Sequence, residues 1–203
     1  MNWIRFIFGA CWASFITTIV WRHWLNHDRP YPPYSQCENC GRRLRAWQLV
    51  PVIGWLLQGG RCRNCYCQVS PFWPLSELAS GLALIFLAPN DWLSWGASLL
   101  VVSALLALAT TDWACQWICP WLLVGLLPLA LLTPPASRTG FDLALALCWI
   151  LVARLPGLGS GDGDFLCALT LLCGGELTCW TVLAGSLLTL ADRRLYARQP
   201  LPL

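Results

Sequence analysis

Charged residues are the scarcest class in this chain. Of its 203 residues, 11% are charged and 57% are hydrophobic, whereas about 25% of the residues of a soluble domain carry a charge. Residues 92–111 and 113–137 contain no charged side chain at all. Each run is long enough to cross roughly 30 Å of hydrocarbon as a helix. A membrane protein is therefore predicted, and a soluble all-helical core is disfavoured because it cannot shield so much apolar surface.

Lysine is absent altogether, which excludes a phosphate-binding loop ending in Gly-Lys-Ser/Thr. Arg5 alone precedes the first apolar run, and more arginines lie between the first run and the second: Arg22, Arg29, Arg42, Arg43, Arg45, Arg61 and Arg63. Because basic loops stay in the cytoplasm, residues 22–70 are predicted to be cytoplasmic and the N-terminus to face outward. A cleavable signal peptide over residues 1–21 is the alternative, although its cleavage site is unconvincing.

The apolar runs predict an all-α fold, a polytopic helical bundle of about six or seven helical segments, some half-length. We expect a single membrane domain over residues 1–203, with a cytoplasmic loop inserted at residues 35–70. One crossing is predicted through residues 120–133. Residues 165–191 are too short for two crossings, so two half-length helices broken at the CGGE stretch, residues 173–176, are predicted there.

Four of the twelve cysteines form two C-x2-C pairs, Cys37 with Cys40 and Cys62 with Cys65. Two such pairs can close a tetrahedral shell of four sulfurs around zinc. Neighbouring arginines favour thiolates, and a reducing cytoplasm disfavours the alternative of disulfides. We therefore predict a structural zinc ion that shapes a loop without a core. Cys67, which follows soon after the second pair, confounds this interpretation of the pattern.

Two aspartates occupy the boundaries of apolar runs and are the candidate catalytic groups. Asp112 ends one run, and Asp164 opens another within the stretch GDGDF. Each has a structural interpretation, an interfacial cap for Asp112 and a helix N-cap for Asp164. Together they suggest a pair that shares one proton and activates water for attack on a peptide carbonyl. Gly161 and Gly163 would give this site a flexible backbone that approaches substrate closely.

With these motifs the chain resembles the type IV prepilin peptidases, polytopic aspartic proteases of bacterial inner membranes. The resemblance covers most of residues 10–175. It rests on ASF (13–15), CENCGRRL (37–44), LVPVIGWLLQGGRCRNC (49–65), SPFWPLSEL (70–78), Asp112 and GDGDF (161–165).

The resemblance implies that Asp112 and Asp164 are the catalytic pair. Family members cleave the leader from prepilins or pseudopilins of type IV pilus and type II secretion systems on the cytoplasmic side. Many then methylate the new N-terminus with S-adenosylmethionine. Glu77 matches a family glutamate, so it is a candidate contact for the leader or the methyl donor; the alternative is a carboxylate that reaches the interface or pairs with an arginine.

The implied location is the bacterial inner membrane, with a periplasmic N-terminus and an active site facing the cytoplasm. Membrane lipid and prepilins are the expected partners, with no nucleic acid, and the oligomeric state is left open. The chain ends in RQPLPL where family members continue into another helix, so a short or truncated member is expected. Two alternatives remain. One is an inactive relative that binds prepilins or the assembly machinery without cleaving. The other is a zinc-bearing membrane scaffold or a different intramembrane aspartic protease, and the cysteine loop argues against the latter.

Overall fold

A computed structural model describes residues 2–22, 34–87, 91–132, 140–154 and 159–191. The chain divides into two compact units, Met1–Leu132 and Thr133–Leu203. Within the described ranges the regular structure is helical, with two isolated β-bridges in one loop. Six of the described helices have 13 residues or more. The predicted all-α class is confirmed, and the single membrane domain stays a prediction.

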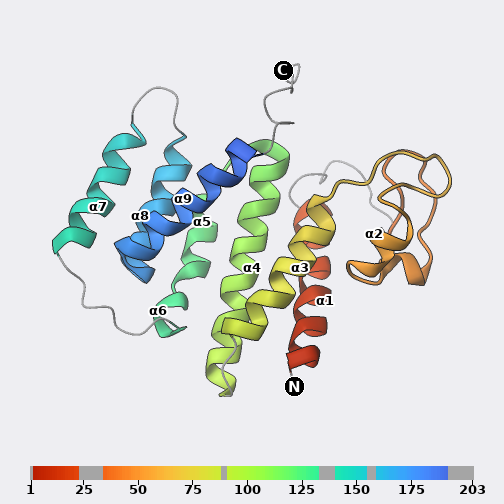
Figure 1. Cartoon of the computed structure of the whole chain (residues 1–203), viewed down its shortest axis with the longest axis horizontal. Helices are drawn as coiled ribbons and strands as arrows, with labels where there is room; N and C mark the ends of the chain where they lie inside the picture. Colours follow the sequence, from red (N-terminus) through yellow and green to blue (C-terminus); the bar gives the residue numbers. More distant parts are fainter. Residues whose placement is uncertain (1, 23–33, 88–90, 133–139, 155–158, 192–203) are drawn as a thin grey trace. The chain divides into compact units, whose positions relative to one another are not determined.

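The first unit is built on three helices that lie side by side, α1 (Asn2–Val20), α3 (Phe72–Leu87) and α4 (Trp92–Cys115), with α3 antiparallel to the other two (Figure 1). The loop between α1 and α3 contains the short helices η2 (Ala46–Leu49) and α2 (Ile53–Leu57). Asp91 caps α4 by accepting a hydrogen bond from the Ser94 amide at 3.0 Å, as acidic N-caps do. The bundle thus carries the cysteine-containing loop at one end.

Small residues bring α1 and α3 together. A Cβ atom on Gly9 would lie 2.7 Å from the Ser80 carbonyl oxygen, so only glycine permits this approach. The Ser80 hydroxyl in turn donates to the Gly9 carbonyl at 3.0 Å. Such close contacts between small residues are typical of helices packed in membranes. Four buried side chains from the three helices form a hydrophobic cluster: Ala13, Leu84, Val102 and Leu106.

The crossing predicted through residues 120–133 is interrupted. The segment forms three short pieces, α5 (Pro120–Leu123), η3 (Val124–Leu126) and α6 (Leu129–Leu132). Pro128 has no amide hydrogen to donate to a helix, which accounts for a break beside it. Gly125 places η3 against α4, because a Cβ there would lie 2.7 Å from the Cβ of Ala104.

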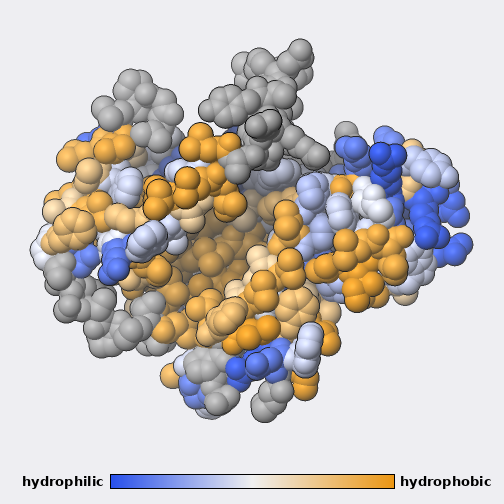
Figure 2. Space-filling view, in the orientation of Figure 1, coloured by the Kyte–Doolittle hydropathy of each residue, from blue (hydrophilic) through white to orange (hydrophobic). Residues whose placement is uncertain are grey.

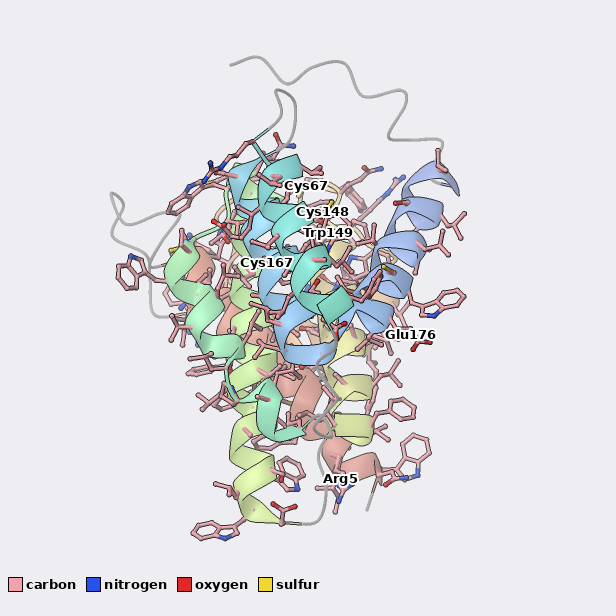
Figure 3. The ribbon with its side chains drawn as sticks, turned by 90° about the vertical axis from the view of Figure 1, so that its left-hand side faces the viewer. Arg5, Cys67, Cys148, Trp149, Cys167 and Glu176 are labelled. Atoms are coloured by element: carbon pink, nitrogen blue, oxygen red, sulfur yellow. The ribbon has the colours of Figure 1, made fainter. Side chains whose placement is uncertain are left out.

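The second unit consists of α7 (Gly140–Val152), α8 (Ser160–Cys173) and α9 (Gly175–Ala191). The predicted break in residues 173–176 is confirmed, since Gly174 has a φ of 92° between α8 and α9. The carboxylate of Asp142, in the first turn of α7, accepts a hydrogen bond from the Gly175 amide at 2.7 Å. Figure 3 shows α7 with Cys148 and Trp149 beside α8 with Cys167. Asp142 therefore fixes the start of α9 from outside that helix.

Among the helices that the structure describes, two are long and apolar enough to cross a membrane, α1 with 19 residues and α4 with 24. Helices α3 and α7 are apolar but shorter. Large apolar side chains are exposed along the helices of the first unit, including Trp3 on α1 (81%), Phe86 on α3 (83%) and Trp92 on α4 (90%). Figure 2 shows hydrophobic residues over the helices and hydrophilic ones gathered over the loop between α1 and α3.

Candidate functional site

The loop between α1 and α3 contains two copies of one small hairpin, which we call knuckle 1 (residues 35–44) and knuckle 2 (residues 60–69). The copies are related by a shift of 25 positions. In knuckle 1 the Cys37 amide donates to the Arg42 carbonyl at 3.0 Å, and in knuckle 2 the Cys62 amide donates to the Cys67 carbonyl at 2.9 Å.

The other backbone hydrogen bonds of the knuckles match in the same way. The Gly41 amide donates to the Cys37 carbonyl at 2.8 Å, as the Tyr66 amide does to the Cys62 carbonyl at 2.9 Å. Gly41 and Tyr66 both adopt the left-handed conformation, with φ values of 67° and 57°. The sequences SQCENCGRRL and GRCRNCYCQV were the available signal for this repeat.

The two knuckles bring the four predicted cysteines together. The sulfurs of Cys37, Cys40, Cys62 and Cys65 all lie within 4.8 Å of one another. The Cys37 and Cys65 sulfurs are 3.8 Å apart, and the Cys40 and Cys62 sulfurs are 4.0 Å apart. A tetrahedral zinc ion with bonds of about 2.3 Å to sulfur requires sulfur–sulfur separations of about 3.8 Å. The predicted four-cysteine cluster is thus confirmed as a group that can hold zinc.

Backbone amides lower the pKa of three of these thiols, which favours the thiolate form that binds metal. Hydrogen bonding by the Arg42 amide lowers the pKa of Cys40. The Cys65 amide lowers the pKa of Cys62, and the Cys67 amide lowers that of Cys65. Burial instead raises the pKa of Cys37 to about 12. All twelve cysteines are free, so the disulfide alternative is not found in this structure.

Cys67 lies directly beside this cluster. Its sulfur is 3.3 Å from the Cys65 sulfur and 3.5 Å from the Cys37 sulfur. The hydrogen bond with the Cys65 thiol raises the pKa of Cys67. In knuckle 1 the equivalent position is Arg42, whose guanidinium donates to the Asn64 side chain at 2.6 Å. Cys67 therefore places a thiol beside the cluster where knuckle 1 has a guanidinium.

Glu77 on α3 holds the segment that joins the two knuckles. Its carboxylate accepts a hydrogen bond from the Val52 amide at 2.7 Å. Val52 has φ 61° and ψ −53°, and the Ile53 amide donates to the Pro51 carbonyl across it at 2.6 Å. This is the strained form of the γ-turn, which a β-branched residue rarely adopts. Glu77 thus has a structural contact that the sequence did not predict, and its role toward leader or methyl donor stays a prediction.

A cavity of about 570 Å³ lies between this loop, the end of α1 and the start of α3. Glu77 lines it together with Glu38 and the indoles of Trp21, Trp55 and Trp73. Burial raises the pKa of Glu38. The volume of the cavity is in the range of small-molecule sites. Aromatic faces beside carboxylates suit a ligand with a planar ring and a positive charge.

Asp112 lies at the loop end of the first unit. It occupies the last turn of α4, where the Gln116 amide donates to its carbonyl at 2.9 Å, and its side chain is exposed. The ring of the next residue, Trp113, stacks on Phe72 at the start of α3, with centroids 5.3 Å apart. A carboxylate in the last turn opposes the helix dipole, so helix stability does not explain this aspartate.

Asp164 lies in the second unit, one turn inside α8, with an exposed side chain. The N-cap of α8 is Gly159, so the capping interpretation of Asp164 is wrong. Gly163 is buried and helical, and a Cβ there would lie 3.0 Å from the Trp149 carbonyl and collide with Ala153. Gly163 therefore allows α8 to approach α7, and Gly161 lies half-buried in the first turn. The catalytic pair and the flexible site backbone stay predictions.

Comparison with known proteins places the chain in a family. A family model described as the bacterial peptidase A24 N-terminal domain matches residues 7–90. The prepilin leader peptidase/N-methyltransferase of Bacillus subtilis (strain 168) is 30% identical over 221 residues, which is 98% of this chain and 87% of that protein. The type 4 prepilin-like proteins leader peptide-processing enzyme of Escherichia coli O78:H11 is 31% identical, over 76% of this chain and 70% of that protein.

The chain belongs to the prepilin leader peptidase/N-methyltransferase family. It spans 59% of the length of the relatives from Stutzerimonas stutzeri and Pseudomonas aeruginosa, each 31% identical to it. No solved structure matches the chain. The predicted family is therefore confirmed.

Proposed function

We propose that this protein is an intramembrane aspartic endopeptidase that removes the leader from prepilins or pseudopilins on the cytoplasmic side of the bacterial inner membrane. One observation carries the proposal: in a chain of this family, Asp112 lies in the last turn of the apolar helix α4, at the end of the first unit that bears the basic loop. Asp164, near the start of α8, is its proposed partner.

The proposed chemistry uses both carboxyl groups. One, ionised, removes a proton from water as the water attacks the scissile carbonyl, and the other, protonated, donates to the carbonyl oxygen. Two carboxyls that share a site hold one proton between them because both cannot ionise cheaply. No metal is needed for this reaction, which fits a zinc cluster built from four sulfurs with no open ligand position.

Aromatic residues support the membrane placement. Trp21, Phe72, Trp73 and Trp113 contact one another at the loop end of the first unit. Trp3, Phe86 and Trp92 are exposed at the other end of the same helices. Such pairs of aromatic belts mark the two membrane interfaces, and α1, with 19 residues, spans roughly 28 Å between them. The basic loop then faces the cytoplasm, and the N-terminus faces the periplasm.

Zinc and S-adenosylmethionine are the proposed cofactors. Cys37, Cys40, Cys62 and Cys65 would hold zinc, which supplies the loop with a fixed shape. The cavity lined by Glu38 and Glu77 is the proposed site for the methyl donor, whose sulfonium and adenine suit carboxylates and indoles. When bound, the donor supplies a methyl group for the new N-terminus.

The test is cleavage of a co-expressed prepilin, followed by its mobility on a gel. Asp112→Asn and Asp164→Asn should each slow processing at least about 100-fold. Asp162→Asn is the matched control, because Asp162 is an exposed aspartate in the same first turns of α8 and should be dispensable. Processing at the wild-type rate in either of the first two variants refutes the aspartic pair. No processing by the wild type, together with capture of the prepilin, supports the alternative of a binding relative.

A further inference from the structure

Besides the four cysteines of the cluster, knuckle 2 has one more thiol, at the position where knuckle 1 has a guanidinium. Superposing the repeats by their shift of 25 positions sets Cys67 opposite Arg42. The Arg42 side chain leaves the cluster to bond Asn64, whereas the Cys67 sulfur lies 3.3 Å from that of Cys65 and 3.5 Å from that of Cys37. The same backbone hairpin therefore presents a further metal-binding atom in one copy only.

The position of this sulfur matters because zinc in such sites takes four ligands and not five. A tetrahedral shell needs sulfurs about 3.8 Å apart, and Cys67 is already closer than that to one edge of the shell, the one joining Cys37 and Cys65. It therefore cannot be an additional ligand, but it lies close enough to both sulfurs of that edge to take the place of one of them.

We propose that Cys67 is a spare ligand of the four-sulfur site and replaces Cys65, an inference that rests on the proposed zinc site. In the exchange the bond from zinc to the Cys65 sulfur breaks and one to the Cys67 sulfur forms. The proton that Cys67 gives up passes to the departing Cys65 thiolate, whose sulfur is 3.3 Å away. Charge and the number of sulfurs on zinc stay the same.

Cys65 is the ligand exchanged because each knuckle then still supplies two sulfurs. With Cys67 in place of Cys65, knuckle 2 contributes Cys62 and Cys67, and knuckle 1 keeps its own pair. Replacing Cys37 would leave knuckle 1 attached by Cys40 alone. The Cys40 sulfur faces Cys62 at 4.0 Å on the opposite edge of the cluster, so loss of Cys40 has no substitute.

Zinc per chain, measured on purified full-length protein in detergent, tests the inference. Wild type, Cys67→Ser and Cys65→Ser should each hold about one zinc ion. Cys65→Ser/Cys67→Ser and the matched single variant Cys40→Ser should hold less than a tenth of that. Zinc in the wild type but none in Cys65→Ser would overturn the spare ligand and leave the zinc site intact. No zinc in the wild type would refute the zinc site and the inference together.

Alkylation mapped by mass spectrometry gives a readout independent of folding yield. In the zinc-loaded wild type the reagent should modify Cys67 more than Cys65. In zinc-loaded Cys65→Ser, Cys67 should become at least tenfold less reactive because its sulfur is bound. Equal reactivity of Cys67 in both proteins contradicts the exchange.

Discussion

Knuckle 1 and knuckle 2 share a backbone but differ in side chains. The hydrogen bonds that fold each hairpin agree within about 0.1 Å between the copies. The left-handed position is Gly41 in one and Tyr66 in the other, and the following position is Arg42 or Cys67. The comparison teaches that one hairpin backbone, held by the same hydrogen bonds, can present side chains of different chemistry.

The largest expected effect is the loss of zinc binding when knuckle 1 loses a ligand, and its recovery when knuckle 1 is given the extra thiol of knuckle 2. Cys40→Ser removes a ligand and should weaken zinc binding at least about 100-fold, since even partners outside the ligand shell matter by 10–100-fold. Adding Arg42→Cys places a thiol where knuckle 2 has Cys67, and this double variant should recover most of the bound zinc. Competition with a chelator measures both affinities.

Arg42→Ala in the Cys40→Ser background is the control for that rescue, because it removes the bond to Asn64 without adding a thiol. Recovery of zinc with alanine, or no recovery with cysteine, would break the equivalence of the two knuckles.

A smaller effect is expected at the segment that joins the knuckles. Glu77→Ala leaves the Val52 amide without its acceptor in a strained turn, so it should destabilise the loop by about 2 kcal/mol. Glu77→Gln keeps an acceptor and should cost about half as much. Protection from proteolysis between residues 45 and 59 measures the difference, and equal protection in all three proteins would contradict this role.

The smallest effect concerns the left-handed positions. Gly41→Ala should destabilise knuckle 1 by about 1 kcal/mol, purely through its φ of 67°, because no atom lies within 4 Å of the added Cβ. Tyr66→Gly, at the equivalent place in knuckle 2, should not destabilise that hairpin. The Tyr66 side chain is 73% exposed, and glycine adopts the left-handed conformation at this position more easily than tyrosine does. Thermal unfolding of the zinc-loaded proteins compares them.

Local signals in the sequence were sufficient for several features. The C-x2-C spacing predicted the cysteine cluster, and the absence of charge predicted α4. The glycines of CGGE predicted the break at Gly174. Each of these depends on residues a few positions apart, where spacing and backbone preference decide the outcome.

Features that depend on tertiary packing were not predictable in this way. The Val52 amide meets Glu77 across 25 positions, and the Gly175 amide meets Asp142 across 33. In both cases a carboxylate on one helix satisfies a backbone amide of a distant turn, and no periodicity indicates such a pairing. Pro128 was visible in the sequence, but the apolar run around it favoured a continuous crossing.

The most direct test of the aspartic mechanism is whether Asp112 and Asp164 act as one unit. Cleavage rates of a prepilin should fall about 10²–10⁴-fold in Asp112→Asn and in Asp164→Asn, and the double variant should be no slower than the slower single variant, since a pair that works together fails when either member is lost. Wild-type rates in either single variant, or losses that multiply in the double variant, would contradict the proposed pair.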